Sequence, residues 1–250
     1  MMGEREETKM KLERVTITGL DRKTDVFRLM AMAPAFHPLV EFAVLASPSR
    51  AGKEPRYPTI EEIKTWLSYV RKFKVAVHIC GRYSRKPNEF FEAIGPDHSC
   101  FLDRIQWNVA PSHLKLKDIT EMAMRASEGH HTVIVQIRDE ESEILLKTLQ
   151  DNHVTAQPLF DASGGRGLPF ENVRTPLSSP ATGRWTGYAG GISPETVSGV
   201  LERLEAELPK DQPVWIDMET GVRTDDWLDL DKVQEVLCRC YTFTQEQKRP

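Results

Sequence analysis

Hydrophobic positions along the chain fall into two alternating patterns. Short runs rich in β-branched residues recur eight times, and such nearly continuous apolar runs are typical of buried parallel strands. The runs are Val15–Gly19, Val40–Ser47, Val75–Gly81, Arg104–Val109, Thr132–Ile137, Ala156–Asp161, Trp185–Ala189 and Val214–Met218. Between most of them lie segments with apolar residues at helical spacing, the clearest containing Ile60, Ile63, Leu67 and Val70. The pattern predicts strands that alternate with helices along the whole chain.

Each repeating unit contains about 30 residues, the length of one strand, one helix and two loops. Eight units predict an α/β fold, a single-domain (β/α)8 TIM barrel over residues 14–244. A doubly wound open sheet is the main alternative, but Gly19-Leu20-Asp21 after the first strand is not a GxGxxG fingerprint. Residues 1–13 and 245–250 are mainly polar, and we expect a frayed N-terminus and a C-terminal tail there.

Composition and charge narrow the classes of protein that this chain can be. Its 250 residues are 40% hydrophobic, enough to bury one substantial core. A net charge of -4 removes the electrostatic basis for avid nucleic-acid binding. No stretch approaches the roughly 18 consecutive apolar residues of a membrane helix, and Met1–Arg14 lacks the apolar core of a signal peptide. We therefore expect a cytoplasmic protein that binds neither nucleic acid nor membrane, with its four cysteines reduced.

The carboxyl ends of the predicted strands carry many polar side chains. A (β/α)8 barrel builds its active site there, from the last residues of each strand and the loop that follows. The candidates are Thr18, Ser47, Arg50, Arg56, His78, Cys80, Gln106, Asn108, Gln136, Arg138, Asp161, Asp217 and Glu219. His130 and His131, in contrast, precede the fifth strand, so we expect them to have a structural role.

Glycine-rich turns follow the sixth, seventh and eighth predicted strands. Backbone N–H groups can approach an anion closely at glycine, and the helix expected to start at Ser193-Pro194 would point its positive end at a phosphate. Phosphate sites after strands seven and eight recur in this fold. The predicted phosphate-binding residues are Gly164, Gly165, Gly167, Gly190, Gly191, Thr220 and Gly221. The alternative is that these glycines only supply positive φ in tight turns.

Several of these segments resemble signatures of the phosphoribosylanthranilate isomerase family. Thr16-Ile17-Thr18-Gly19-Leu20 stands where the family has Lys-Ile-Cys-Gly-Leu, and Pro55-Arg56-Tyr57 resembles its Ser-Pro-Arg-Tyr. Gln106-Trp107-Asn108-Val109 is similar to the family's Gln-Leu-His-Gly. The three most specific matches are Asp161–Gly167, Ala189–Glu195 and Ile216–Val222. The resemblance spans roughly residues 15–240.

The resemblance implies an Amadori isomerisation of a phosphorylated sugar conjugate, as in tryptophan biosynthesis. One group protonates the ring oxygen of the ribose and another removes the C2 proton, so two titratable groups are required. Asp161 matches the family's general acid. Arg56 matches its clamp for the anthranilate carboxylate, with Arg50 as a rival in the same loop. Gln106 matches a strand-four position that faces the substrate, and Asn108 follows it.

The chain departs from the family at Thr18, where the family carries the cysteine that acts as general base. A threonine hydroxyl is too weakly acidic to be an anion at neutral pH, so it cannot simply take over that role. His78 and Cys80, two apart on the third predicted strand and thus on one face, are the first candidates for the base. The other candidates are Asp21, Asp217 and Glu219.

Other functions also fit parts of the pattern. A non-catalytic barrel, or an enzyme for a different sugar phosphate, would keep the glycine turns. A lyase or aldolase usually needs a Schiff-base lysine at a strand end, but Lys74 lies at the opposite end of the third strand. His78, Cys80 and Asp161 could converge on a divalent metal, yet no strand supplies His-x-His, so we expect neither metal nor cofactor. The expected partner is a small phosphorylated sugar, and the expected state is a monomer or homodimer.

Overall fold

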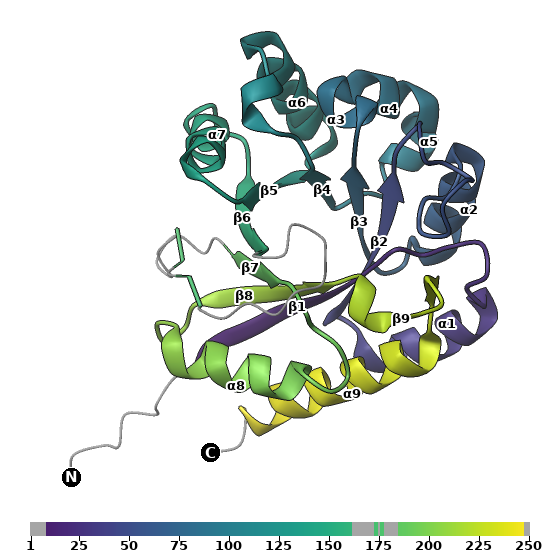
Figure 1. Cartoon of the computed structure of the whole chain (residues 1–250), viewed down its shortest axis with the longest axis vertical. Helices are drawn as coiled ribbons and strands as arrows, with labels where there is room; N and C mark the ends of the chain where they lie inside the picture. The colour runs from purple at the N-terminus through teal and green to yellow at the C-terminus, as the bar shows by residue number, and fades with distance from the viewer. Residues whose placement is uncertain (1–8, 162–172, 175, 178–184, 248–250) are drawn as a thin grey trace.

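Eight parallel strands close into a barrel in the computed structural model, which describes residues 9–161, 173, 174, 176, 177 and 185–247 (Figure 1). Each strand pairs with its neighbours in chain order, and β8 closes the ring by pairing with β1. The strands are β1 (Lys11–Thr18), β2 (Val40–Ala46), β3 (Lys74–Ile79), β4 (Arg104–Trp107), β5 (Thr132–Ile137), β6 (Ala156–Asp161), β7 (Thr186–Ala189) and β8 (Pro213–Met218). This confirms the predicted (β/α)8 fold and its eight strands.

Helices surround the ring of strands (Figure 1). The longer ones are α2 (Ile60–Val70), α4 (Pro87–Ile94), α6 (Leu116–Gly129), α7 (Glu140–Asp151), α8 (Val197–Glu207) and α9 (Leu230–Glu246). The shorter elements are α1 (Val26–Met32), η1 (Ala33–Phe36), α3 (Arg82–Arg85), α5 (Pro96–Ser99), η2 (Pro111–His113) and η4 (Thr220–Val222), with a hairpin of β9 (Arg223–Thr224) and β10 (Trp227–Leu228). Each described helix in the chain is too short or too polar to cross a membrane.

The barrel extends slightly beyond the expected range at both ends. The N–H of Lys11 donates to Gln212 O at 2.9 Å, which adds residues 11–13 to the first strand. At the other end α9 continues to Glu246 and packs beside α8 and β1. The ordered barrel therefore includes part of both segments that their polarity predicted to be frayed.

Two helix starts can be compared with hydroxyl residues that would cap them, and one of the two agrees. Thr59 forms a capping box with Glu62 at the start of α2. The helix expected at Ser193-Pro194 instead begins at Val197, so that prediction was wrong by three residues. The N–H of Ser193 donates to Thr196 Oγ1 at 2.9 Å, and this bond holds residues 193–196 in a turn. The Ser193 amide is therefore engaged within the chain.

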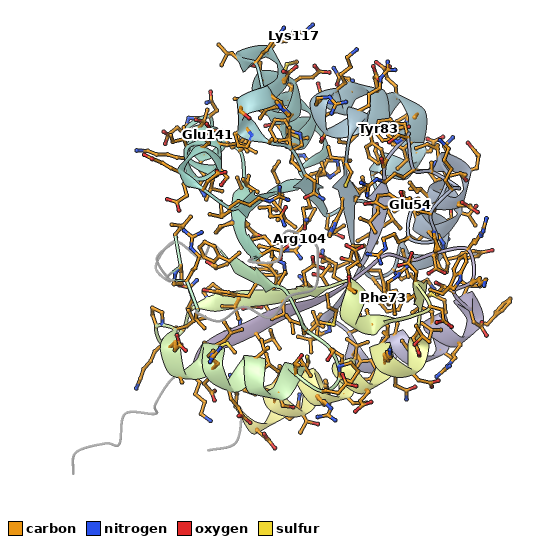
Figure 2. The ribbon with its side chains drawn as sticks, viewed as in Figure 1. Glu54, Phe73, Tyr83, Arg104, Lys117 and Glu141 are labelled. Carbon is orange, nitrogen blue, oxygen red and sulfur yellow. The ribbon has the colours of Figure 1, made fainter. Side chains whose placement is uncertain are left out.

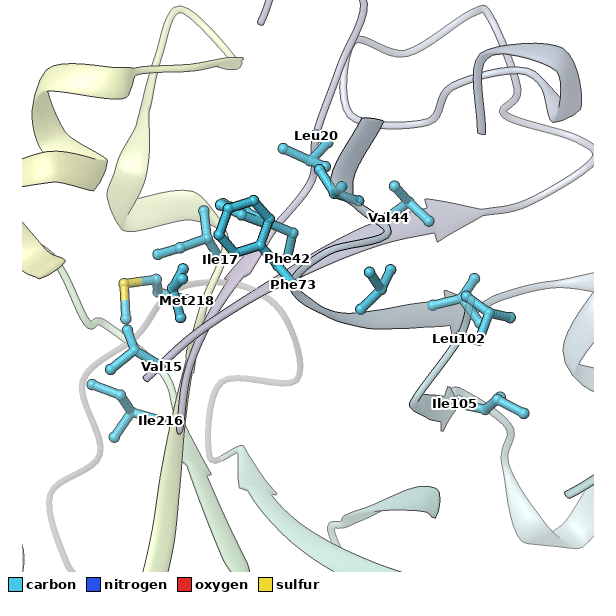
Figure 3. Close-up of a cluster of buried hydrophobic side chains, with 14 of the residues drawn as sticks. Val15, Ile17, Leu20, Phe42, Val44, Phe73, Leu102, Ile105, Ile216 and Met218 are labelled. Atoms are coloured by element: carbon cyan, nitrogen blue, oxygen red, sulfur yellow. The ribbon is translucent and has the colours of Figure 1, made fainter. Parts of the chain in front are cut away.

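The main hydrophobic core lies between the strands and the helices around them. Val15, Ile17, Phe42 and Ile216 are fully buried in it (Figure 3). Side chains alternate between the two faces of a strand, so the intervening residues point into the barrel. A separate and much smaller apolar cluster occupies that interior, formed by Ile134, Leu159, Ala189 and Trp215.

Much of the rest of the barrel interior is polar and contains a buried ion pair. Arg104 lies near the middle of the ring of strands (Figure 2), and its Nε is 2.9 Å from Glu41 Oε2. The same guanidinium donates to Thr16 Oγ1 at 3.0 Å and to Gln157 Oε1 at 3.3 Å. It also lies 4.4 Å from the ring centroid of Trp215. All three nitrogens of this guanidinium form hydrogen bonds, which is how a buried charge is tolerated.

His131 has the structural role expected for it. Its side chain is buried, with Nδ1 2.8 Å from Leu102 O, and it stacks on Phe91. Burial lowers the pKa of the imidazole, so the ring is neutral at physiological pH. His130 precedes it in the left-handed conformation that ends α6.

Candidate functional site

A cavity of about 360 Å³ opens at the carboxyl ends of the barrel strands. Most of the residues predicted from the sequence line it. They are Arg50, Arg56, His78, Cys80, Gln106, Asn108, Gln136, Asp161, Gly190, Gly191, Asp217, Glu219, Thr220 and Gly221, joined by Glu54, Tyr57 and Asp226. Gly164, Gly165 and Gly167 lie outside the described residues. The strand-end rule therefore located this cavity.

Two carboxyl groups stand on either side of β7 at the base of this cavity. Asp161 on β6 is in register with Ala189, and Ala189 is in register with Asp217 on β8. Neighbouring strands are about 4.8 Å apart, so the two backbones are separated by about 10 Å. Because the residue between them is a small alanine, both acids can face the same enclosed space. Asp161 Oδ2 also accepts a 2.6 Å hydrogen bond from Gln136 Nε2.

Asp217 is an acid that titrates near neutrality. Its side chain is buried, and burial raises the pKa from 3.8 to about 7. The Thr18 hydroxyl donates to Oδ1 at 2.6 Å, and this bond and the charge of Arg104 oppose the rise. The negative charge of Asp161 adds to it. At pH 7 this carboxyl group can both accept and release a proton.

Thr18 acts on Asp217 and does not reach the cavity itself. It is fully buried, and its hydroxyl proton points to the carboxylate. The sequence identified Thr18 as a position where the family's base is missing, and the structure shows a hydrogen-bond donor there. The partner of that donor could not be read from the sequence, because the two residues are 199 positions apart.

His78 and Cys80 lie side by side in the cavity wall, but neither is charged. Burial lowers the pKa of His78 to about 4, and its Nε2 has no hydrogen-bond partner among the described residues. Burial raises the pKa of the Cys80 thiol, despite a 3.3 Å hydrogen bond that its sulfur accepts from Asn108 Nδ2. Asn108 Oδ1 in turn accepts from Gln106 Nε2 at 2.9 Å. Burial therefore makes the His78 imidazole a weak base and keeps Cys80 in its thiol form, which is not a base.

Arg56 is already paired within the chain. Its Nη1 is 2.6 Å from Glu219 Oε1, and its Nε donates to Asp226 Oδ1 at 3.0 Å. Burial raises the pKa of Glu219, and the nearby guanidinium opposes that rise. Sequence reasoning missed Asp226, which sits in the β9–β10 turn. Positive φ at Asp225 and Asp226 is what a tight hairpin of this kind needs.

Arg50 makes a second set of contacts on the same loop. Its Nη1 donates to the hydroxyl of Tyr57 at 2.9 Å, and its Nε is 3.6 Å from Glu54 Oε1. Its guanidinium also lies 5.1 Å from the centroid of the Tyr57 ring. Burial raises the pKa of Tyr57 to about 12, so this phenol stays protonated.

The loops after β7 and β8 meet at glycines that line the cavity. Gly190 and Gly191 have φ of 108° and 63°, values that other residues rarely adopt. A Cβ atom on Gly221 would lie 1.9 Å from the carbonyl oxygen of Ile192, so the two turns touch. Among the described residues there is no group of three potential metal-ligating acids, histidines or cysteines.

Comparison with known proteins agrees with this architecture. The model of the family described as N-(5'phosphoribosyl)anthranilate (PRA) isomerase matches residues 116–239. No curated protein sequence matches the chain significantly. The matched segment contains both Asp161 and Asp217 and the turns after β7 and β8.

Solved structures share the fold at low sequence identity. Phosphoribosylanthranilate isomerase from Thermotoga maritima is 14% identical with a TM-score of 0.56, covering 91% of this chain and 98% of its own. The enzyme from Thermococcus kodakaraensis is 13% identical with a TM-score of 0.53, at 91% and 98% coverage. Pyruvate kinase from Pyrobaculum aerophilum is 12% identical with a TM-score of 0.56, covering 94% of this chain and 72% of its own. Different enzymes fit equally well, so these likenesses establish the fold alone.

Proposed function

We propose that this phosphoribosylanthranilate isomerase-like protein catalyses an Amadori isomerisation of a phosphorylated sugar conjugate, with Asp161 and Asp217 as its acid and base. The single observation that carries the proposal is the pair of carboxyl groups flanking β7 in one cavity. The matched family model points to the same reaction class. Tryptophan biosynthesis is the pathway if the substrate is phosphoribosylanthranilate.

Two proton transfers make up the reaction. In its protonated form, Asp161 gives its proton to the ring oxygen while the bond between C1 and that oxygen breaks, and the lone pair of the amine nitrogen forms a C1=N bond. Asp217 then removes the C2 proton. The electrons of the C2–H bond form the C1=C2 bond of an enolamine, and the π electrons of the C1=N bond return to the nitrogen. This intermediate tautomerises to the ketone. A base with a pKa of about 7 matches the requirement that it be ionised yet still proton-accepting near neutral pH.

Thr18 takes a positioning role in this scheme. Its hydroxyl occupies Oδ1 of Asp217 and so leaves Oδ2 for the substrate. In this scheme the base is on β8, and the family's base position, Thr18, is on the adjacent strand β1. A threonine at position 18 is therefore compatible with catalysis. Gly190, Gly191 and Gly221 would hold the phosphate, because all three line the cavity and no side chain shields their backbone N–H groups.

Turnover of phosphoribosylanthranilate, followed by loss of its fluorescence, tests the proposal. Asp161→Asn and Asp217→Asn should each lower kcat/KM by about 100-fold or more, the usual worth of general acid–base catalysis. Asp211→Asn is the matched control, since Asp211 is exposed and has a positive φ that asparagine also adopts. Cys80→Ala should lose less than about tenfold. Retention of full activity by Asp217→Asn would refute the assignment of the base.

A non-catalytic barrel that binds a phosphorylated metabolite is the second candidate. The observation favouring it is Thr18 in place of a cysteine that the family uses as base. Stabilisation of the protein by ribose 5-phosphate, together with no turnover of any phosphorylated arylaminoribose tested, would support this candidate over the isomerase.

A further inference from the structure

A chain of two hydrogen bonds reaches Asp161 from the neighbouring strand β5. Gln136 lines the cavity, and its Nε2 donates to Asp161 Oδ2 at 2.6 Å. Arg138, two residues further along the chain, donates from Nη2 to Gln136 Oε1. Both side chains are thus linked to the proposed acid, although the two proton transfers themselves require neither.

The direction of this chain follows from the chemistry of its groups. A guanidinium can only donate hydrogen bonds, so the amide oxygen of Gln136 must face Arg138. The NH2 group of the amide then faces Asp161. The backbone N–H of Arg138 donates to Ser142 Oγ at 2.9 Å, which ties Arg138 to the first turn of α7. The Gln136 amide is therefore held in one of its two orientations.

The bond from Gln136 determines which oxygen of Asp161 carries the proton to be transferred. In a neutral carboxyl group one oxygen carries the proton and the other is the acceptor. Because Oδ2 accepts from Gln136, the proton of neutral Asp161 lies on Oδ1. Asp161 is also buried, so water competes little for Oδ2. The acid thus presents its proton from one defined atom.

The same bond favours the loss of that proton. As Asp161 gives up its proton, negative charge develops on both carboxylate oxygens. A hydrogen bond to an ionised acceptor is roughly twice as strong as one to a neutral acceptor. The contact from Gln136 Nε2 therefore strengthens towards the transition state, and such an interaction raises kcat more than it changes KM.

We propose that Gln136 is a positioning residue for Asp161, and that Arg138 fixes the orientation of the Gln136 amide. This rests on the proposed function, since it takes Asp161 as the acid. Both residues act through Asp161, and neither has to touch the substrate.

Steady-state turnover of phosphoribosylanthranilate by two variants tests the inference. Gln136→Met has a side chain of similar length without the donor, and we expect kcat to fall by about tenfold or more while KM stays within about threefold. Arg138→Met should lower kcat by about threefold or more, because the amide can then turn over. Arg138 is exposed, so this variant remains informative even if Gln136→Met does not fold. Gln234→Met, exposed on α9 and outside the cavity lining, is the control and should keep wild-type kinetics.

A double-mutant cycle separates positioning from a general loss of structure. Added to Asp161→Asn, Gln136→Met should lower the residual kcat/KM by less than about twofold, because the group on which Gln136 acts is already gone. A further tenfold loss in that background would overturn the inference. So would wild-type kcat in folded Gln136→Met or in Arg138→Met, beside an impaired Asp161→Asn. Full activity of Asp161→Asn, or no turnover by the wild type, would instead refute the proposed function and this inference with it.

Discussion

Replacing Asp217 with asparagine should make the protein more stable at alkaline pH while removing the proposed base. Asparagine has nearly the same shape, and its Oδ1 can still accept the hydrogen bond from Thr18. The substitution removes only the cost of ionising a buried acid. Its effect on stability is therefore a direct measure of that cost, and no substrate is needed to observe it.

The sign and size of the effect follow from the pKa of Asp217. The carboxyl group has a pKa of about 7 in the folded protein and 3.8 as its ordinary value, so the native state binds the extra proton between these two pH values. Below pH 3.8 both states are protonated and no cost exists. As the pH rises towards 7 the wild type loses about 1.4 kcal/mol per pH unit, and the loss reaches about 4 kcal/mol above pH 7. The asparagine variant is spared this loss.

Urea unfolding at several pH values measures the difference. The stability advantage of Asp217→Asn over the wild type should grow from about 1.5 kcal/mol at pH 5 to about 4 kcal/mol at pH 8. Asp211→Asn, at an exposed site, serves as control for the general effect of removing an acid. Parallel stability curves for the wild type and Asp217→Asn across pH 5–8 would refute the reasoning, since they would mean that this acid ionises as easily in the folded protein as in the unfolded chain.

Two further predictions concern the barrel interior. Gly187→Ala should destabilise the protein by about 1–3 kcal/mol in urea unfolding, because a Cβ there would lie 2.3 Å from the indole of Trp215. Gly199→Ala is the control, because nothing lies within 4 Å of the added Cβ, and it should be neutral or stabilising by up to about 1 kcal/mol. Equal effects at the two sites would contradict the close packing of Gly187 against Trp215. Glu41→Gln should cost about 3 kcal/mol by leaving Arg104 as an uncompensated buried charge, and a loss below about 1 kcal/mol in the same assay would show that the charge is not buried as described.

The positions of the strands could be predicted well because each strand is a short apolar run without the spacing of a helix. Ala156–Asp161 has the same bounds in the sequence prediction and in the structure. Its last residue lines the cavity, as the strand-end rule requires. Periodicity is a local property, so a chain of regularly repeating units reveals both its fold and the end of the barrel where the cavity opens.

Pairings between distant strands could not be predicted in this way. Thr18 and Asp217 are neighbours only because β8 closes the ring against β1. Arg104 begins a predicted strand, and nothing in the sequence around it indicates that Glu41 neutralises it inside the barrel. The state of a titratable group depends on such partners and on burial. The candidate bases could therefore be named from the sequence, but the choice among them required their burial and their hydrogen-bond partners in the folded chain.

The main hydrophobic core is separate from the small apolar cluster inside the barrel, and this separation decides which substitutions the protein tolerates. Most of its apolar packing lies outside the ring, between strands and helices, while the lumen holds charges, amides and a few apolar side chains. Exchanging one lumen residue for another consequently leaves the bulk of the packing intact. A scaffold of this kind can lose a reactive thiol from one strand and recruit an acid from the next. New substrates can then arise by evolution without rebuilding the fold.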